Sequence, residues 1–208
     1  MRFVFLTGAG ISVASGIRPF RGPGGLWNDQ EVARLSDAAT LRTDPQAVID
    51  FWNQMKDQVD AAEPNPAHFA IAELEDRLRP GDELTLITTN VDGLHQRAGS
   101  RNVIEFHGSL HRTRPVGERV RPDIVLFGEP IPNTARDAAF QAARYADVFI
   151  AVGTSAQVRP ASHLVKKPFY KGARTIFVNP DGIKPRYFRQ MVTGRAEEML
   201  PTLLKELY

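Results

Sequence analysis

The 208-residue chain contains no cysteine. Disulfide bonds are therefore excluded, and so is every zinc site that is built on thiolates. The sequence also lacks a run of about 20 apolar residues, the length that a membrane-spanning helix needs. No charged and apolar leader pattern precedes the first short apolar run. We therefore expect a cytoplasmic protein that has no membrane partner.

An excess of charge of one sign is missing as well. The chain has 26 Lys and Arg against 24 Asp and Glu, which gives a formal net charge of +2. Charge alone therefore predicts no direct nucleic-acid partner. A content of 42% hydrophobic and 24% charged residues is typical of soluble globular proteins. The length suits one domain, or one domain with a small insertion.

Short apolar runs indicate six strands, at 3–6, 84–88, 103–106, 124–127, 148–152 and 175–178. Several runs are continuous rather than alternating, which suits strands that are covered on both faces. Helical patterns lie between them, over 66–78, 134–146 and 195–207. Alternation of strands and helices with short links predicts an α/β protein with a Rossmann-like, doubly wound parallel sheet.

Residues 22–65 depart from this alternation. A glycine- and proline-rich stretch at 22–25 is followed by a probable helix over 47–57. That helix carries an apolar stripe of Val48, Phe51, Trp52 and Met55. We expect a small helical lid on the sheet domain; the alternative is a plain packing helix.

A glycine-rich turn follows the first strand. Gly8, Ala9 and Gly10 leave almost no side chain, so backbone N–H groups could approach a phosphate closely. A helix that starts near Ser12 would add its positive end, and Arg21 would add a cation. The third glycine lies at 16, so the spacing differs from the dinucleotide pattern G-x-G-x-x-G.

Polar side chains gather after the second strand, in the stretch TTNVDGLH. Asn90, Asp92 and His95 stand there at the carboxyl end of a strand, where α/β folds bind ligands. Asp92 could instead cap a helix that starts at Gly93. The hydroxyl of Ser155, which follows the run at 148–152, could contact a phosphate.

Proton transfer near neutral pH calls for a histidine. His107 follows the strand at 103–106 and precedes a glycine, which places it at the carboxyl end of the sheet. His68 lies within a helical pattern, so we interpret it as structural. His107 and His111 are four residues apart, but the turn at Gly108 makes a helix there improbable, and we expect no metal site.

The ordered set of motifs is GAG at 8–10, TTNVDGLH at 88–95, HG at 107–108, FGE at 127–129, GTS at 153–155 and VNP at 178–180. This set resembles the sirtuin family of NAD-dependent protein deacylases, from Phe3 to about Leu204. The resemblance implies NAD as the cofactor and an acyl-lysine protein or peptide as the substrate. The acyl group would pass to ADP-ribose as nicotinamide is released.

The resemblance also implies roles for individual residues. His107 would act as the proton acceptor, Asn90 would position the reacting groups, and Asp92 would hold the nicotinamide carboxamide. Ile17, Phe20, Asn90 and Val91 would wall the nicotinamide pocket, whereas His95 would support the loop without a catalytic role. The other implied cofactor positions are Gly8, Ala9, Gly10, Ser12, Arg21, Thr89, Gly153, Thr154, Ser155, Asn179, Asp181 and Ala196.

The substrate chain would add to exposed strand edges. The positions implied for it are Val125, Phe127, Gly128, Glu129 and Val158. Sirtuins that remove acidic acyl groups carry a tyrosine and an arginine on the lid helix, where this chain has Trp52 and Met55. Without the arginine, a succinyl carboxylate lacks its bidentate partner, so we expect a neutral or fatty acyl group.

Two departures from the family pattern stand out. Thr89 replaces a glutamine of the cofactor site, and the family's four-cysteine zinc ribbon is missing. We expect a single domain over 1–208 in which a short loop, 109–123, replaces that module. The arginines in this loop predict a solvated turn, with a partner-binding role as the alternative. Loss of the module could weaken peptide binding, or a homodimer could cover the gap.

Two other functions remain open at this point. The same cleavage of NAD could serve ADP-ribosyl transfer to a protein, or plain NAD hydrolysis. The chain could also be a weakly active module that binds NAD or ADP-ribose and regulates a partner.

Overall fold

The computed structural model describes residues 1–19, 25, 29–155 and 163–208. A six-stranded parallel sheet forms its centre, in the order β3-β2-β1-β6-β7-β8. The strands are β1 (Arg2–Thr7), β2 (Glu83–Thr88), β3 (Val103–Glu105), β6 (Val148–Val152), β7 (Arg174–Asn179) and β8 (Gln190–Thr193). The strand order proceeds outward in opposite directions from the β1–β6 pair, so the topological switch point lies between these two strands.

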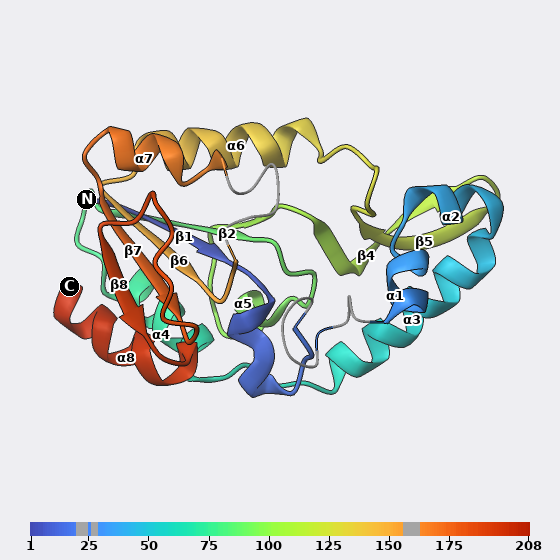
Figure 1. The fold of residues 1–208 in the computed structure, drawn as a ribbon, viewed down its shortest axis with the longest axis horizontal. Coiled ribbons are helices and arrows are strands. Elements are labelled where there is room, and N and C mark those ends of the chain that lie inside the picture. Colours follow the sequence, from blue (N-terminus) through green and yellow to red (C-terminus); the bar gives the residue numbers. More distant parts are fainter. Residues whose placement is uncertain (20–24, 26–28, 156–162) are drawn as a thin grey trace.

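Both faces of the sheet are covered by helices (Figure 1). Phe3 and Phe5 of β1 pack in one layer with α4 (Pro66–Arg77) and α8 (Ala196–Leu207). Val4 and Leu6 pack in the other layer with α6 (Asn133–Arg144) and residues next to α7 (Lys166–Tyr170). Alternate side chains of the same strand thus enter opposite apolar layers, which explains its continuous apolar run. The predicted doubly wound fold is confirmed.

Three α-helices form the described part of the predicted lid, residues 22–65. They are α1 (Gln30–Leu35), α2 (Ala38–Thr43) and α3 (Pro45–Asp60). Each begins at an aspartate, Asp29, Asp37 or Asp44, whose side chain accepts a hydrogen bond from a backbone N–H of the first turn. Trp52 is buried on α3, where its Nε1 donates to the carbonyl of Leu35 over 3.1 Å. Lid helices α1 and α3 are thereby joined.

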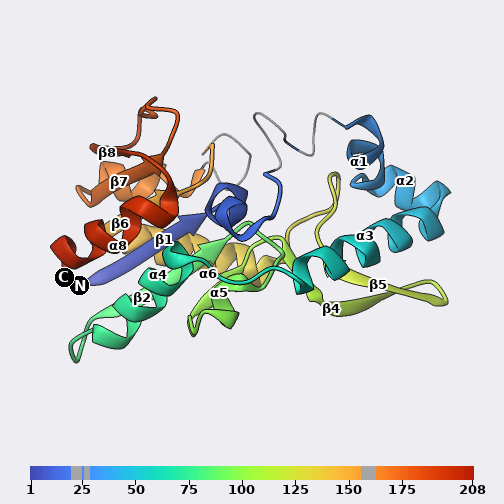
Figure 2. The same cartoon turned by 90° about the horizontal axis from the view of Figure 1, so that it is seen from below.

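An antiparallel hairpin, β4 (Gly108–Val116) and β5 (Arg119–Ile124), packs against α3. Figure 2 shows this hairpin and the lid helices at the end of the molecule opposite the two termini. The expectation of a short loop over 109–123 is therefore wrong. Ion pairs hold its charged residues, so an arginine-rich segment with few apolar residues still forms paired strands.

The strand predicted over 124–127 is also wrong. Strand β5 ends at Ile124, and Phe127 takes part only in an isolated bridge to Asp37. Leu126 is buried in the apolar core that the lid and the hairpin share. The apolar run thus reflects burial in this small core rather than membership of the central sheet.

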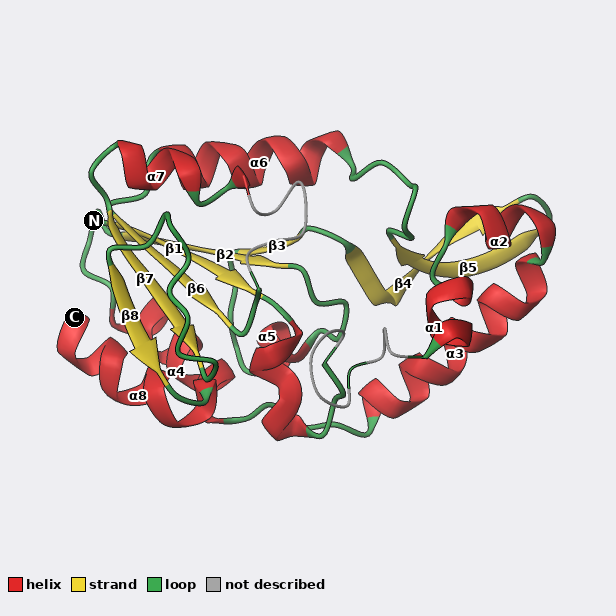
Figure 3. Cartoon of the chain, viewed as in Figure 1, coloured by secondary structure: helices red, strands yellow, loops and turns green. Residues whose placement is uncertain are grey.

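The other predicted elements are found with shifted ends, and Figure 3 shows the observed helices and strands. The chain after the first strand forms a 3₁₀ helix, η1 (Ala9–Ser15), rather than an α-helix from Ser12. Helix α5 (Leu94–Arg97) is the helix after Gly93 that Asp92 was considered to cap, and the amide of Leu94 donates to Asp92. Elements α7 and β8 lie outside every predicted range, because they are too short to give a periodic signal. Among the described residues, no helix has the length and apolar character needed to cross a membrane.

Candidate active site

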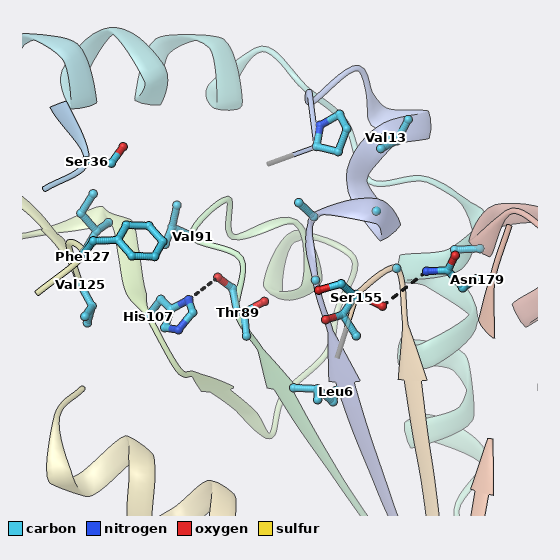
Figure 4. A pocket seen from close by; sticks show the side chains of 18 of the residues that line it. Leu6, Val13, Ser36, Thr89, Val91, His107, Val125, Phe127, Ser155 and Asn179 are labelled. Carbon is cyan, nitrogen blue, oxygen red and sulfur yellow. Dashed lines mark hydrogen bonds between the residues drawn. The ribbon is translucent and has the colours of Figure 1, made fainter. Parts of the chain in front are cut away.

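A cleft of about 1270 Å³ lies at the carboxyl ends of the central strands. Its lining comes from the loops after β1, β2, β6 and β7, from lid residues, and from the turn that follows β5. Figure 4 shows His107 and Thr89 between the side chains of Val125 and Phe127 on one side and those of Ser155 and Asn179 on the other. The cleft therefore lies at the switch point of the sheet, where open α/β folds bind ligands.

The glycine loop and the loop after β6 are in direct contact. The amide of Gly10 donates to the carbonyl of Gly153 over 2.8 Å, and the amide of Gly8 donates to Val152 over 3.1 Å. A Cβ added to Gly10 would lie 2.7 Å from Cα of Gly153, which is too close for any side chain. Gly153 has a φ of 58°, a left-handed conformation that favours glycine. Close approach of two backbones thus explains why glycine stands at these positions.

A buried polar cluster lies behind the glycine loop. The hydroxyl of Ser12 donates to Oδ2 of Asp92 over 2.7 Å, and Nδ2 of Asn90 donates to the same hydroxyl over 3.2 Å. Oδ1 of Asp92 accepts from the amide of Leu94, so this carboxylate also fixes the start of α5. Asp92 is 4% exposed. Burial raises its pKa, and the hydrogen bonds from Ser12 and Leu94 oppose that shift.

Two buried histidines support this cluster. Nδ1 of His68 accepts from the amide of Asn65, so the ring's proton is on Nε2, which lies 3.4 Å from the hydroxyl of Ser12. The ring of His95 stands edge-on to that of His68, and its Nε2 lies 2.9 Å from Oγ1 of Thr7. Burial lowers the pKa of His68 to about 4 and that of His95 well below its usual value. Both rings are therefore neutral near pH 7.

His107 lines the cleft from the turn after β3. Its Nδ1 lies 3.1 Å from the carbonyl of Thr89, so a neutral ring carries its proton on Nδ1 and donates it there (Figure 4). The other ring nitrogen, Nε2, is then a proton acceptor. Burial lowers the pKa of His107, and the Thr89 carbonyl partly offsets that effect. The ring is thus ready to take up a proton near neutral pH.

The turn after β5 forms the wall that faces the lid. The amide of Phe127 donates to the carbonyl of Ser36 over 2.9 Å, and the carbonyl of Phe127 accepts from Ala38 over 2.8 Å. The amides of Val125 and Glu129 also donate to backbone carbonyls. The expectation of an exposed strand edge along this segment is therefore wrong for these amides, because the carbonyls of His107, Ser36 and Leu126 already accept from them.

Two arginines of the hairpin, Arg114 and Arg121, are not part of a solvated turn. Arg121 is 3% exposed, and it donates to Glu129 over 2.5 Å and to the carbonyl of Ile124 over 3.0 Å. Arg114 donates to the same carboxylate over 2.7 Å. Sequence reasoning missed this because the acceptor carboxylate lies outside the hairpin. In the described part of the chain, no group of three or more metal-ligating side chains gathers.

Most of the predicted site residues lie around the cleft. Those that line it are His107, Gly8, Ala9, Gly10, Thr89, Val91, Gly153, Thr154, Ser155, Asn179, Asp181, Ala196, Trp52, Val125, Phe127, Gly128 and Glu129. Ser12, Asn90 and Asp92 are buried behind the lining. Ile17 and Met55 pack instead in the core shared by the lid and the hairpin.

Three predicted positions, Phe20, Arg21 and Val158, lie outside the described residues. Sequence reasoning missed several lining residues, which are Val13, Ala14, Pro19, Ser36, Leu126, Pro130, Ile131, Arg136, Pro180, Arg195 and Glu197. Many of these residues are next to a motif in the sequence, and this proximity could have indicated that they line the cleft. Ser36 and Arg136 carry no such signal, because only the folded chain brings the lid and α6 to the cleft.

The chain is similar to known proteins over its whole length. A family model described as the Sir2 family matches residues 8–117 and 111–160. NAD-dependent protein deacylase 2 of Pyrobaculum aerophilum is 40% identical over 228 residues, which span 98% of this chain and 90% of that protein. NAD-dependent protein deacylase 1 of Pseudomonas aeruginosa is 37% identical over 239 residues, spanning 100% of this chain and 94% of that protein.

Solved structures are similar as well. A mutant Sir2 homologue in complex with ADP-ribose gives a TM-score of 0.90 at 37% identity, over 99% of this chain and 91% of the other. A Sir2 homologue in complex with NAD gives 0.84 at 35% identity, over 99% and 89%. A Sir2 complex with a p53 peptide and NAD⁺ gives 0.84 at 29% identity, over 99% and 92%.

Proposed function

The chain belongs to the Sir2 family, and from this membership we propose how its cleft performs NAD-dependent deacylation of protein lysines. Its relatives are named NAD-dependent protein deacylases, and similar structures hold NAD or ADP-ribose. The chain is accordingly an NAD-dependent protein-lysine deacylase with acyl-lysine proteins or peptides as substrates. The roles of its individual residues are our proposal.

The residues around the glycine loop fit a dinucleotide. Backbones at Gly8, Gly10 and Gly153 approach one another without side chains, which leaves the floor of the cleft open to a diphosphate. Ser155 and Asn179 line the cleft at the ends of neighbouring strands and would bind the phosphates and a ribose. NAD, when bound, supplies the ribose whose bond to nicotinamide breaks and the ADP-ribose that accepts the acyl group.

One observation carries the proposal: His107 faces the cleft with Nδ1 bonded to the carbonyl of Thr89. That bond fixes the tautomer and the orientation of the ring, which leaves Nε2 to accept a proton from a ribose hydroxyl. Burial lowers the pKa of His107, so the base stays unprotonated at neutral pH. We assign to His107 the role of general base in acyl transfer.

Asp92 and Asn90 would serve the release of nicotinamide. Each oxygen of the Asp92 carboxylate already accepts one hydrogen bond and has the capacity for a second. A carboxamide N–H of the leaving base would take that second place, next to Val91 in the lining. Asn90 bonds both the hydroxyl of Ser12 and the carbonyl of Gly8, so it holds the two loops in register.

A neutral or fatty acyl group fits the lid end of the cleft best. Trp52 lines this end with apolar residues from the turn after β5, among them Leu126 and Phe127. Arg136 also lines the cleft, but its guanidinium pairs with Asp137 over 2.9 Å. A succinyl carboxylate would have to compete for that cation, so acidic acyl groups are disfavoured.

Zinc is not required in this proposal. The sequence has no thiolate, and ion pairs hold the hairpin that stands where the family's zinc ribbon would follow the HG motif. We expect a chelator to leave the activity and the melting temperature unchanged. Loss of activity that added zinc restores would contradict this. A cytoplasmic location, a homodimer and the absence of a nucleic-acid partner also stay predictions.

The test is mass spectrometry of NAD mixed with the purified protein and with acetyl-, succinyl- or myristoyl-lysine peptides. We expect acyl-ADP-ribose and free lysine with the acetyl and myristoyl peptides, and little product with the succinyl peptide. His107→Ala is the matched control, because it should abolish acyl transfer without loss of NAD binding. No acyl product with any peptide would refute the assignment.

One observation favours a second candidate. The amides of Val125, Phe127 and Glu129 are already hydrogen-bonded within the chain, so the wall offers a peptide few backbone partners. Cleavage of NAD without a good peptide groove would leave ADP-ribosyl transfer or NAD hydrolysis. Nicotinamide release without acyl product, in the same experiment, would identify that function. A weakly active regulatory module would bind NAD and release little nicotinamide.

A further inference from the structure

Two arginines from opposite strands of the hairpin meet at one carboxylate of the cleft wall. Arg114 of β4 and Arg121 of β5 are cross-strand partners. Like charges directly opposite each other destabilise a strand pair unless an anion lies between them. Glu129 supplies that anion, and its two oxygens each accept from one guanidinium, over 2.7 Å and 2.5 Å. The hairpin is thereby bound to a residue that lines the cleft.

The same carboxylate also fixes the backbone of the wall. Oε2 of Glu129 accepts from the amide of Leu126 over 2.9 Å, and the amide of Glu129 donates back to the carbonyl of Leu126 over 3.0 Å. Gly128, between them, has a φ of 83°. This tight turn displays the side chain of Phe127, which is 46% exposed. The position of Phe127 in the cleft therefore depends on how Glu129 is held.

The ion pair between Arg121 and Glu129 is largely buried, which distinguishes it from an exposed surface pair. We call it the arginine–carboxylate joint. The side chain of Arg121 is 4% exposed and that of Glu129 is 17% exposed. Removing Arg121 would leave Oε1 of Glu129 without its guanidinium donor and Arg114 as the remaining partner of the carboxylate. Arg121 also donates to the carbonyl of Ile124, the last residue of β5, so its guanidinium spans the strand end and the turn.

From these contacts we propose that Arg121, together with Arg114, is a positioning residue for the acyl-lysine peptide. It acts through Glu129, by holding the turn of residues 126–129 at the geometry that receives the substrate. An arginine–carboxylate joint would thus organise the wall that cysteine-bound zinc cannot organise in a chain without cysteine. This inference rests on the proposed deacylation, whose peptide must lie along that wall.

Kinetics separate this role from a purely structural one. We would measure steady-state constants for the whole protein, for Arg121→Met and Arg121→Lys, and for Arg119→Met as the control. Arg119 lies on the same strand, and its side chain is exposed. We expect Arg121→Met to raise the KM for an acetyl-lysine peptide about tenfold or more, while the KM for NAD stays within about twofold.

Arg121→Lys should restore part of the peptide affinity, because an ammonium keeps the charge but loses the two-pronged guanidinium geometry. Arg119→Met should leave both constants unchanged. An unchanged peptide KM in folded Arg121→Met would overturn the proposal. A parallel rise in both Michaelis constants would overturn it as well, because it would indicate general damage to the cleft.

Amide hydrogen exchange gives a readout that does not need deacylation. In Arg121→Met, the amide of Leu126 should exchange about tenfold faster, because its acceptor loses a fixed position. The amides of β1 should not change. If the protein shows no deacylase activity but Leu126 exchanges faster in Arg121→Met, the proposed function is refuted. The contact between Arg121 and Glu129 would still be shown to hold the turn. Unchanged exchange at Leu126 would overturn the joint itself.

If Arg121→Met fails to fold, the half-buried Arg114 provides the test. Arg114→Met, Glu129→Gln and the double variant form a cycle of peptide KM values. We expect the peptide KM of the double variant to be no higher than that of Glu129→Gln alone. The reason is that each single substitution already breaks the same contact, between Arg114 and Glu129. Strictly additive effects of the two substitutions would contradict the coupling.

Discussion

The hydroxyl of Ser12 donates to the carboxylate of Asp92 over 2.7 Å and so joins the glycine loop after β1 to the polar loop after β2. The two strands are neighbours in the sheet, and both loops start from its carboxyl edge. The loop that we propose binds the diphosphate and the carboxylate that we propose faces the leaving base are therefore joined by a hydrogen bond.

Removing this hydroxyl should slow the release of nicotinamide. In Ser12→Ala, Asp92 loses a hydrogen bond that favours its charged form, so its pKa should rise further. We expect nicotinamide release to fall about 10- to 100-fold. Ser100→Ala is a matched control, because that hydroxyl is also buried but has no hydrogen-bond partner in the described structure. Equal effects of the two substitutions would contradict the coupling.

Replacing His107 should separate the two halves of the reaction. In His107→Ala, acyl transfer should fall about 10²- to 10⁴-fold, the usual contribution of a general base. Nicotinamide release should survive, since it needs no proton acceptor at this position. Both products are measured in one reaction by mass spectrometry. Loss of nicotinamide release together with acyl transfer would show that the ring is needed to hold NAD.

The pH dependence of acyl transfer should report the same ring. Burial lowers the pKa of His107 below its usual value of 6.5, so the neutral base persists to lower pH than an exposed histidine would. We expect the acid limb of the kcat profile to lie below pH 6.5. A limb above that value, in the presence of saturating NAD and peptide, would contradict the assignment.

Two glycines in the first loop should respond differently to alanine. Gly10→Ala places a Cβ 2.7 Å from the Gly153 backbone, so the two loops must separate. We expect NAD affinity to fall at least about tenfold, which calorimetry would measure. Gly16→Ala meets nothing within 4 Å but has a φ of 85°, so it should cost about 1 kcal/mol of stability and leave NAD affinity unchanged. Similar NAD affinities in both variants would contradict the steric argument.

The stability of the protein should fall in mild acid. His68 has a pKa of about 4 when folded and about 6.5 when unfolded, so the unfolded chain binds more protons between these values. The stability that the neutral His68 ring contributes is fully present above pH 6.5 and is lost as the pH falls toward 4. We expect His68 to lower the free energy of unfolding by about 2 kcal/mol between pH 7.5 and pH 5.

Urea unfolding at several pH values would measure this slope. His68→Gln is the comparison, because a glutamine does not titrate, and its slope should be smaller whatever its absolute stability. His95 is buried beside His68 and has a lowered pKa too, so part of the slope should remain in that variant. Identical slopes in both proteins would contradict the assignment to His68.

The central sheet could be predicted because its signals are local. Each strand has its own apolar run, and both faces of the sheet demand apolar side chains, so β1 and β6 are readable in the sequence. The glycines of the first loop were equally readable, since a chain without side chains at a strand end has few other uses. Short elements such as α7 and β8 were missed because five or four residues hold no periodic pattern.

The sequence by itself thus determined the doubly wound sheet, the ligand-binding carboxyl ends of its strands and the motifs of an NAD-dependent deacylase. Only the tertiary structure decided the rest. The hairpin depends on Glu129, which lies outside it and neutralises Arg114 and Arg121. The cluster of Ser12 and Asp92 depends on His68, which comes from a helix far away in the sequence. Buried polar and charged groups need specific partners, and a partner that lies dozens of residues away leaves no periodic trace in the chain.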